Sequence, residues 1–322
     1  MNNFKKIGLS ALAGSLVAFS AHAGELSATG SASLTMSDSD QNGGAAIGRG
    51  NQFSMGDSIT LAGSGEMDNG MTISVSFEID NDDTGGGEVY DSHSMTLDTN
   101  GMGTITFAGH GGSSAMSALD DTTPNAYEES WDAVSGADTG TRVNGSSGDN
   151  MFTYTSPTIS GATVTMAYLN ASDTTTDVSY SDFAIAYSPE MVDGLTVGYG
   201  QGDTEETAGT EMEDTAMYVK YTYGSVTVGY QENERSAAAT ANQVDFEALG
   251  ISYAVSDNLT IAYSSSESKK GSDADVQEAS GISASFTSGG MTIAGVMNDV
   301  DNVAFDAAND TEGYELNISF AF

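Results

Sequence analysis

Carboxylates are the side chains of this sequence best suited to chemistry. The chain holds 46 Asp and Glu residues against 8 Lys and Arg residues, and its formal net charge is −38. One long segment, residues 111–148, combines a cluster of acidic residues with a single arginine, Arg142. Its carboxylates are Asp120, Asp121, Glu128, Glu129, Asp132 and Asp138. Their chemistry is electrostatic, because such groups attract cations and repel anions.

Covalent catalysis finds little support in the residue types. Cysteine is absent, and neither His93 nor His110 belongs to a recognisable Ser/His/Asp or Cys/His arrangement. Residues 38–43, Asp-Ser-Asp-Gln-Asn-Gly, open like a calcium-binding loop, but the twelfth position is Arg49 rather than glutamate. We therefore expect no catalytic residue, no metal site and no cofactor. Weak calcium or magnesium binding at the acidic loops remains an alternative.

Period-two alternation of apolar and polar residues predicts the elements that position these carboxylates. It is clearest in residues 71–80, where Met71, Ile73, Val75, Phe77 and Ile79 share one face. No long window shows a competing helical period. Sixteen strands are predicted, near 25–37, 51–65, 69–82, 90–98, 102–110, 149–156, 161–170, 177–188, 194–201, 211–223, 225–232, 242–254, 258–266, 275–287, 290–298 and 313–322.

The connections and the polar face predict an all-β transmembrane antiparallel barrel. Tight turns rich in Asn, Asp and Gly alternate with longer acidic loops, and tyrosines recur near strand ends. The polar face carries Ser, Thr and Gly rather than Lys and Glu. A soluble sandwich would share the alternation, but these features together indicate apolar residues toward lipid and polar residues toward a wet lumen. The last strand must then close against the first.

The first residues have the pattern of a secretory signal peptide. Lys5 and Lys6 precede an apolar stretch at 7–19, and Ala21-His22-Ala23 forms a small-x-small cleavage site. We predict a signal peptide at 1–23 and a barrel domain at 24–322. No later stretch is apolar enough for a membrane helix. The acidity also argues against nucleic acid as a partner.

Several stretches resemble the Gram-negative general diffusion porins, which are sixteen-stranded trimeric outer-membrane channels. Residues 58–63 followed by 68–78 are similar to that family's second hairpin, and residues 102–107 resemble its fifth strand. Residues 149–157, Asp-Asn-Met-Phe-Thr-Tyr-Thr-Ser-Pro, are similar to the segment after its inward-folded loop. Phe322 matches the terminal aromatic residue that serves as an assembly signal. The resemblance implies that residues 111–148 fold into the barrel and narrow the pore.

The sequence departs from that family in its basic residues. The family sets the loop carboxylates against wall arginines and lysines, whose positions here hold Ser58, Ala62, Thr72, Gly109 and Thr153. His110 is the nearest basic candidate beside Gly109. By strand parity we expect the lumen to be lined by Glu78, Asp80, Asp182, Glu315 and Lys220. Arg142 is the single basic residue of the loop. A constriction of carboxylates without its basic counterpart predicts a cation preference.

We therefore expect a porin that allows passive diffusion of small hydrophilic solutes and ions, without enzymatic activity. The resemblance implies a homotrimer in the cell outer membrane, in contact with lipid, lipopolysaccharide and the outer-membrane assembly machinery. Two alternatives stay open: a substrate-specific outer-membrane channel, and a non-transport barrel with a hydrolytic or structural role. An acidic calcium-bound repeat array would need a short internal repeat, which the sequence lacks.

Overall fold

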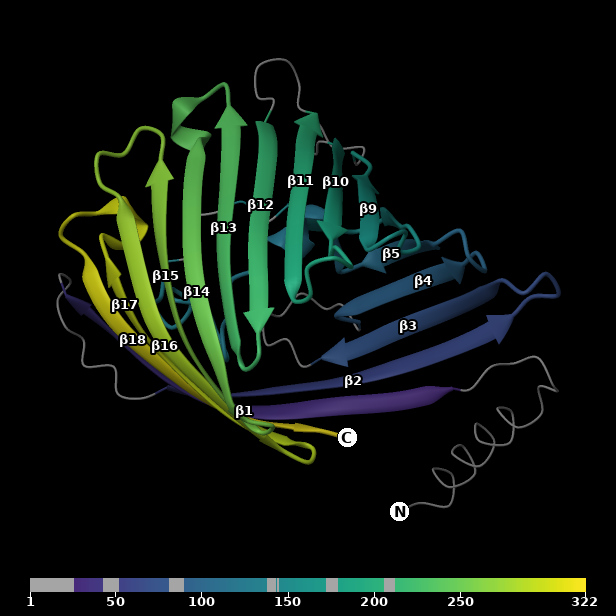
Figure 1. Ribbon diagram of the computed structural model, residues 1–322, viewed down its shortest axis with the longest axis horizontal. Coiled ribbons are helices and arrows are strands. Elements are labelled where there is room, and N and C mark those ends of the chain that lie inside the picture. Colours follow the sequence, from purple (N-terminus) through teal and green to yellow (C-terminus); the bar gives the residue numbers. More distant parts are fainter. Residues whose placement is uncertain are drawn as a thin grey trace, which may run out of the picture.

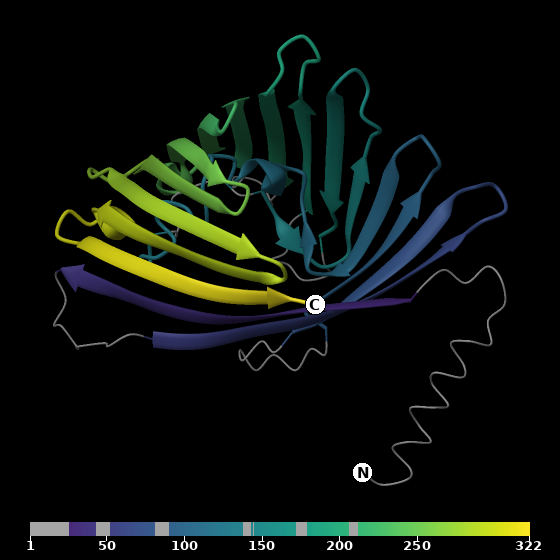
Figure 2. The same ribbon diagram turned by 60° about the horizontal axis from the view of Figure 1, so that its bottom comes forward.

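The protein is a single closed antiparallel β-barrel (Figures 1 and 2). The computed structural model describes residues 26–42, 52–80, 90–137, 143, 145–171, 179–205 and 212–322. The predicted signal peptide at 1–23, Asp138 and Arg142 lie outside the described residues. Around the barrel, β1 pairs with β2 on one side and with β18 on the other, so the sheet has no free edge.

The sixteen predicted strands are confirmed, each in its predicted place and with the predicted antiparallel order. The barrel strands are β1 (Ser27–Asn42), β2 (Gln52–Glu66), β3 (Thr72–Asp80), β4 (Ser92–Asp98), β5 (Thr104–His110), β8 (Met151–Thr155), β9 (Ala162–Leu169), β10 (Ser179–Tyr187), β11 (Leu195–Glu205), β12 (Met212–Tyr223), β13 (Val226–Ala237), β14 (Val244–Ser256), β15 (Leu259–Lys270), β16 (Gln277–Ser288), β17 (Met291–Asp301) and β18 (Asp310–Ala321). Two short strands and three 3₁₀ turns complete the described elements: β6 (Gly112–Ser113), η1 (Met116–Leu119), β7 (Ser147–Gly148), η2 (Thr240–Asn242) and η3 (Val303–Phe305). No helix among the described residues is long and apolar enough to cross a membrane.

Several strands run further toward the long loops than the hydrophobic pattern predicts. β13 continues to Ala237, β17 continues to Asp301, and β18 already begins at Asp310. In these extensions the outward positions are polar, and all but Ser236 are acidic, so the alternation of hydrophobicity stops while the backbone pairing continues. Backbone hydrogen bonding therefore sets the strand ends, and burial of apolar side chains does not.

The two faces of the wall follow the alternation in the sequence. Outward side chains such as Leu249, Ile282 and Met297 are exposed, whereas their inward neighbours are small or polar. Inward hydroxyls pair across strands, as in Thr96 with Thr106 at 2.9 Å. Apolar groups exposed over most of the outer wall fit a lipid environment, because hydrocarbon chains rather than water then surround them.

The carboxyl end closes the barrel. The Phe322 amide donates to the Gly30 carbonyl at 2.9 Å, and the Gly30 amide donates to the Phe322 carbonyl at 2.8 Å. The Phe322 ring lies over Gly30, where an added Cβ would come within 2.7 Å of two ring carbons. The Phe322 ring thus occupies the space beside β1 and β18 that a side chain at position 30 would otherwise fill.

We predict that Gly30→Val impairs closure of the barrel, because the new side chain would displace the Phe322 ring from the seam. Overpacking of this kind costs about 1–3 kcal/mol. The folded fraction, measured by heat-modifiable migration after refolding in detergent, should fall below that of the unaltered protein. A second substitution, Phe322→Ala, makes room for the valine and should restore part of the loss in refolding. Equal folded fractions for the unaltered protein and Gly30→Val would contradict the prediction.

Candidate functional site

The long segment between β5 and β8 lies inside the barrel and is closed at its base. β6 pairs with β7, which joins Gly112 to Gly148 and Ser113 to Ser147. Just below, His110 and Asp149 form an ion pair at 2.7 Å when the imidazole is protonated. Figure 2 shows this blue segment within the ring of strands. The candidate His110 therefore lies at the root of the loop, where it ties the two ends together.

Hydrogen bonds attach the loop to the inner wall over a path of many strands. The Asp182 carboxylate on β10 accepts from the backbone amides of Ala115 at 3.1 Å and Met116 at 2.8 Å. Further along, the Asn298 side chain on β17 accepts from the Ala133 amide at 2.8 Å. Other wall groups that bond the loop are Gln231, Asn233, Ser266, Gln277, Ser283 and Glu315. The loop consequently follows β10 to β18 and leaves β2–β5 facing the lumen.

Inward glycines on these strands let the loop lie directly against the wall. A Cβ added at Gly250 would come within 2.9 Å of three Pro124 atoms, two of which are backbone atoms. At Gly229 it would meet the same proline ring at 2.5 Å. The loop likewise crosses Gly200, Gly281 and Gly313. Because these positions are glycines, the lumen face of successive strands has no side chains where the loop passes, and the loop backbone can lie directly on the sheet.

Two apolar clusters fill the space between loop and wall. The first contains Met116 and Leu119 from the loop, packed with wall alanines. The second contains Trp131, Val134 and Ala137 from the loop with Phe246 and Val300 from the wall. The Trp131 ring is 3% exposed and meets Phe246 edge-on at 5.3 Å between centroids. Trp131 thus anchors the loop to the wall.

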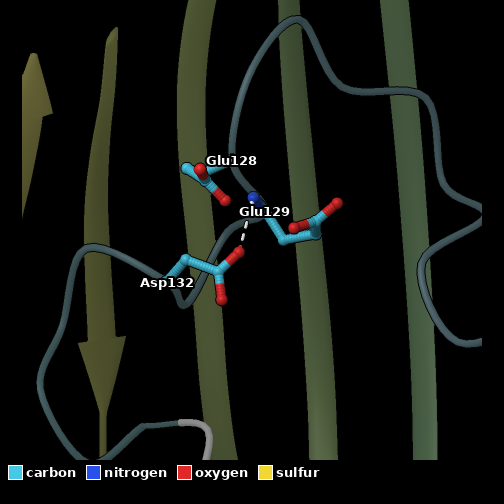
Figure 3. Close-up of side chains that lie close together, drawn as sticks. All are labelled: Glu128, Glu129 and Asp132. Atoms are coloured by element: carbon cyan, nitrogen blue, oxygen red, sulfur yellow. Dashed lines mark hydrogen bonds between the residues drawn. The ribbon is translucent and has the colours of Figure 1, made fainter. Parts of the chain in front are cut away.

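The middle of the loop presents a group of carboxylates. Glu128, Glu129 and Asp132 each have a carboxylate oxygen within 4.8 Å of the others (Figure 3). The Glu129 backbone amide donates to Asp132 at 2.9 Å, which holds the turn that brings them together. Tyr127 beside them donates its hydroxyl to Glu315 of β18 at 2.5 Å. We call Glu128, Glu129, Asp132 and Glu315 the acidic cluster.

Crowding changes the protonation of this cluster. Burial, the hydrogen bond with Asp132 and the charge of Asp121 raise the pKa of Glu129 to about 9. Burial and the negative charges of Asp132 and Glu315 also raise the pKa of Glu128. Glu129 is accordingly protonated and uncharged at neutral pH. The cluster then carries less charge than its four carboxyl groups would suggest, and gains charge as pH rises.

The other sequence-predicted residues lie in different places. Asp182 faces inward but is buried beneath the loop, so it is an anchor of the loop and does not line open lumen. Glu78 is half-buried on β3 and accepts from the Ser92 hydroxyl at 3.2 Å, while Asp80 is exposed where β3 ends. Lys220 is half-buried on β12, with its ammonium 6.0 Å from the Tyr218 ring centroid.

Asp120 and Asp121 precede the acidic cluster in the loop. The Asp120 carbonyl accepts from the Gln231 side chain, and the charge of Asp121 acts on Glu129. Asp138 and Arg142 cannot be placed, because they lie outside the described residues.

Sequence reasoning missed an inward ion pair near the long-loop end. Arg235 on β13 donates twice to Asp214 on β12, with both distances 2.7 Å. The signal was present, because Asp214 and Arg235 share the inward parity of their strands. This pairing neutralises one of the few basic residues of the wall. Across the described residues, no ion pair joins a lysine, arginine or histidine to the acidic cluster.

A closed sixteen-stranded barrel with exposed apolar groups outside, polar groups inside and a loop folded into its lumen defines a membrane channel of the porin class. The chain belongs to the Gram-negative porin family, whose sequence model matches residues 8–282. The recognition and the fold predicted from sequence are thereby confirmed, and family and fold together imply the outer membrane.

Solved porins share this fold at low sequence identity. An anion-selective porin from Comamonas acidovorans has a TM-score of 0.68 and 15% identity, covering 92% of this chain and 99% of its own. OmpT of Vibrio cholerae has a TM-score of 0.69 and 11% identity, covering 94% and 99%. Salmonella typhi OmpF, solved with daunomycin, has a TM-score of 0.69 and 14% identity, covering 93% and 98%.

At these identities the likeness establishes the fold alone, and anion selectivity is a property of the Comamonas protein. No curated protein sequence matches the chain.

We predict that Gly250→Val displaces the loop from the wall, because its side chain would collide with the Pro124 backbone. Single-channel conductance in planar bilayers should change, and open-channel current noise should rise as the loop loses its seat. Gly63→Val is the matched control, since a Cβ there meets nothing closer than 4.0 Å. The prediction is wrong if Gly250→Val and the control conduct alike while both show the heat-modifiable migration of folded barrels.

Proposed function

We propose that the protein is a general diffusion porin that prefers cations. Small hydrophilic solutes and ions cross passively, and the inward loop selects them by size. The observation that carries the proposal is the acidic cluster, which joins the loop to the β18 wall without a basic partner among the described residues. A cation passing the cluster is attracted, and an anion is repelled.

The preference depends on charge at close range. Two unit charges about 4 Å apart interact by about 1 kcal/mol in water, and more strongly where the lumen is narrow. Salt screens this interaction, since the Debye length falls from about 8 Å at 0.15 M to about 3 Å at 1 M. Cation preference should therefore weaken as salt concentration rises. The wall of β1–β5 adds paired hydroxyls, and among its described residues only His93 and His110 can carry positive charge.

Further properties of the proposal come from family membership. We propose cleavage of residues 1–23 as a signal peptide, assembly as a homotrimer, and recognition of Phe322 by the outer-membrane assembly machinery. Outer-membrane lipid and lipopolysaccharide would surround the barrel. Transport would need neither a cofactor nor enzymatic turnover, which suits a lumen whose charged residues hold the loop or face passing solute.

Neutralising the acidic cluster should reduce the cation preference. For the triple variant Glu128→Gln, Asp132→Asn and Glu315→Gln, we expect the cation-over-anion permeability ratio to fall about fivefold, the effect of roughly 1 kcal/mol at the constriction. The ratio follows from the reversal potential in a planar bilayer under a potassium chloride gradient.

The control for this variant neutralises Glu190 and Asp193, two exposed carboxylates in the turn between β10 and β11. An unaltered ratio in the triple variant, or anion selectivity in the unaltered protein, would contradict the proposed mechanism.

Cation preference should increase with pH. Because its pKa lies near 9, Glu129 is neutral at pH 7 and becomes negative as pH passes through that value. The permeability ratio should therefore rise between about pH 7 and pH 10, where ordinary carboxylates are already ionised. Glu129→Gln should remove most of this rise and leave the value at pH 7 nearly unaltered. A flat profile in the unaltered protein would show that Glu129 is already charged at neutral pH.

A further inference from the structure

The barrel brings two histidines together on neighbouring strands. The sequence holds three histidines, and two of them, His93 and His110, fall within the described residues. Strand register places His93 of β4 directly opposite His110 of β5, at the long-loop ends of the two strands. The centroids of their rings are 6.4 Å apart, and the ring planes are inclined by 17°. Because directly opposed residues of an antiparallel pair share one face of the sheet, the two imidazoles are neighbours on the same face.

Gly109 gives the His93 imidazole room against β5. Ser94 pairs with Ala108 and His93 pairs with His110, so Gly109 is the additional residue of a β-bulge between them. A Cβ added at Gly109 would collide with Nε2 of His93. The Nε2 edge of the His93 ring is therefore turned toward the backbone of β5, beside His110.

The protein makes no use of the His93 nitrogens in the part of the chain that the structure describes. Nδ1 of His93 is buried without a hydrogen-bond partner, and no described group bonds to its Nε2. The ring packs instead beside Phe77 at 6.5 Å and Tyr90 at 6.1 Å between centroids. A buried polar atom without a partner costs free energy, and a phenylalanine would fill the same position without that cost. Packing alone therefore does not account for an imidazole at position 93.

The second histidine is oriented by a carboxylate. Nδ1 of His110 lies 2.7 Å from Oδ1 of Asp149. When the imidazole is neutral, this contact places its proton on Nδ1 and leaves the lone pair of Nε2 for another partner. Histidines that bind metal ions commonly donate their other nitrogen to a carboxylate in this way, which orients the ring and makes the ligand more basic. His110 with Asp149 therefore has the arrangement of a metal ligand with its supporting group.

The separation of the two rings is close to that of two ligands of one ion. An ion bonded at about 2.1 Å to an imidazole nitrogen lies roughly 3 Å from the centroid of that ring, so rings about 5–6 Å apart can share it. The observed 6.4 Å needs only a small rotation of one side chain to reach this range. The His110 side chain is 34% exposed, so an ion can enter from solvent and water can complete its coordination.

We propose that His93 and His110 form a binding site for a divalent transition-metal ion, zinc or copper(II), with Asp149 as the residue that positions His110. Imidazole nitrogens suit these ions, whereas calcium and magnesium prefer the oxygen ligands of the acidic loops. The site differs from the acidic cluster in ligand type and in place, since it lies at the root of the inward loop. Sequence analysis gave neither histidine a role in metal binding, because they meet only through strand register.

A bound ion would link β4 to β5 beside the contact that holds the base of the loop. His110 then joins the hairpin, the ion and Asp149 into one connected group. An ion that binds the folded barrel more tightly than the unfolded chain stabilises the barrel by mass action. Metal binding should therefore be visible in the thermal stability of the barrel as well as in the spectrum of the ion.

The test titrates copper(II) into the purified, refolded protein in detergent and follows it by electron paramagnetic resonance. The protein carries no polyhistidine tag, and an excess of magnesium chloride occupies carboxylate sites without competing for imidazole. His93→Gln and His110→Gln each remove one ligand, and Asp149→Ala removes the positioning carboxylate. The matched control combines Glu128→Gln with Asp132→Asn, which removes two neighbouring carboxylates of the loop and keeps both histidines.

We expect one copper ion per barrel, with hyperfine coupling to two imidazole nitrogens, in the unaltered protein and in the control. Each histidine variant should lose the two-nitrogen signal, and Asp149→Ala should bind about tenfold more weakly. A two-nitrogen signal that persists in either histidine variant, or that is absent from the folded unaltered barrel, would overturn the proposal. Loss of the signal in the control would also overturn it, since binding would then belong to the acidic cluster.

Heat-modifiable migration and the reversal potential, measured on the same preparations, separate this inference from the proposed function. Zinc should raise the temperature at which the unaltered barrel changes to its unfolded migration, and should leave that temperature unaltered in His93→Gln. A folded, cation-preferring barrel that binds no copper would overturn the metal site alone. A barrel that binds copper through both histidines without preferring cations would support the metal site and contradict the proposed selectivity alone.

Discussion

Every backbone amide and carbonyl of the wall must find a partner within the sheet, because hydrocarbon offers none. The pairing of β18 with β1 meets this constraint at the only place where the chain could leave an edge. Once the sheet is closed, period-two geometry assigns every side chain to one of two surfaces. The lipid-facing band, the hydroxyl-lined lumen and the seat of the inward loop all follow from that closure and its register.

Closure also creates the space that the inward loop must fill. The loop remains inside because the wall offers it both hydrogen-bonding side chains and bare backbone. Asp182 and Asn298 accept hydrogen bonds from backbone amides of the loop. Gly229 and Gly250 have no side chain, so Pro124 can lie directly against the backbone of the wall. Removal of either kind of feature leaves buried polar groups unpaired or forces the loop away. The position of the acidic cluster is therefore a property of distant strands as much as of the loop.

The strands could be predicted from sequence because lipid on one side and water on the other enforce strict alternation. The predicted strands were too short where this contrast between lipid and water is lost. On β13 the residues that follow Glu232 are polar on both faces, although backbone pairing continues to Ala237. The inward path of the loop could be expected only from family resemblance, since its anchors come from strands far along the chain. Parity placed Asp182 inside the barrel, but it could not show that the loop covers this carboxylate.

Carboxylates lie on both surfaces of the wall, and the repulsion among them is relieved in different ways in the lumen and outside. Inside, crowding and burial raise the pKa of Glu129, so protonation relieves part of the repulsion among the carboxylates of the acidic cluster. Outside, the carboxylates of Glu247, Glu267 and Glu278 are exposed on neighbouring strands, where mobile cations screen the repulsion instead. The charge of the acidic cluster therefore depends on pH, whereas salt screens the carboxylates of the outer wall.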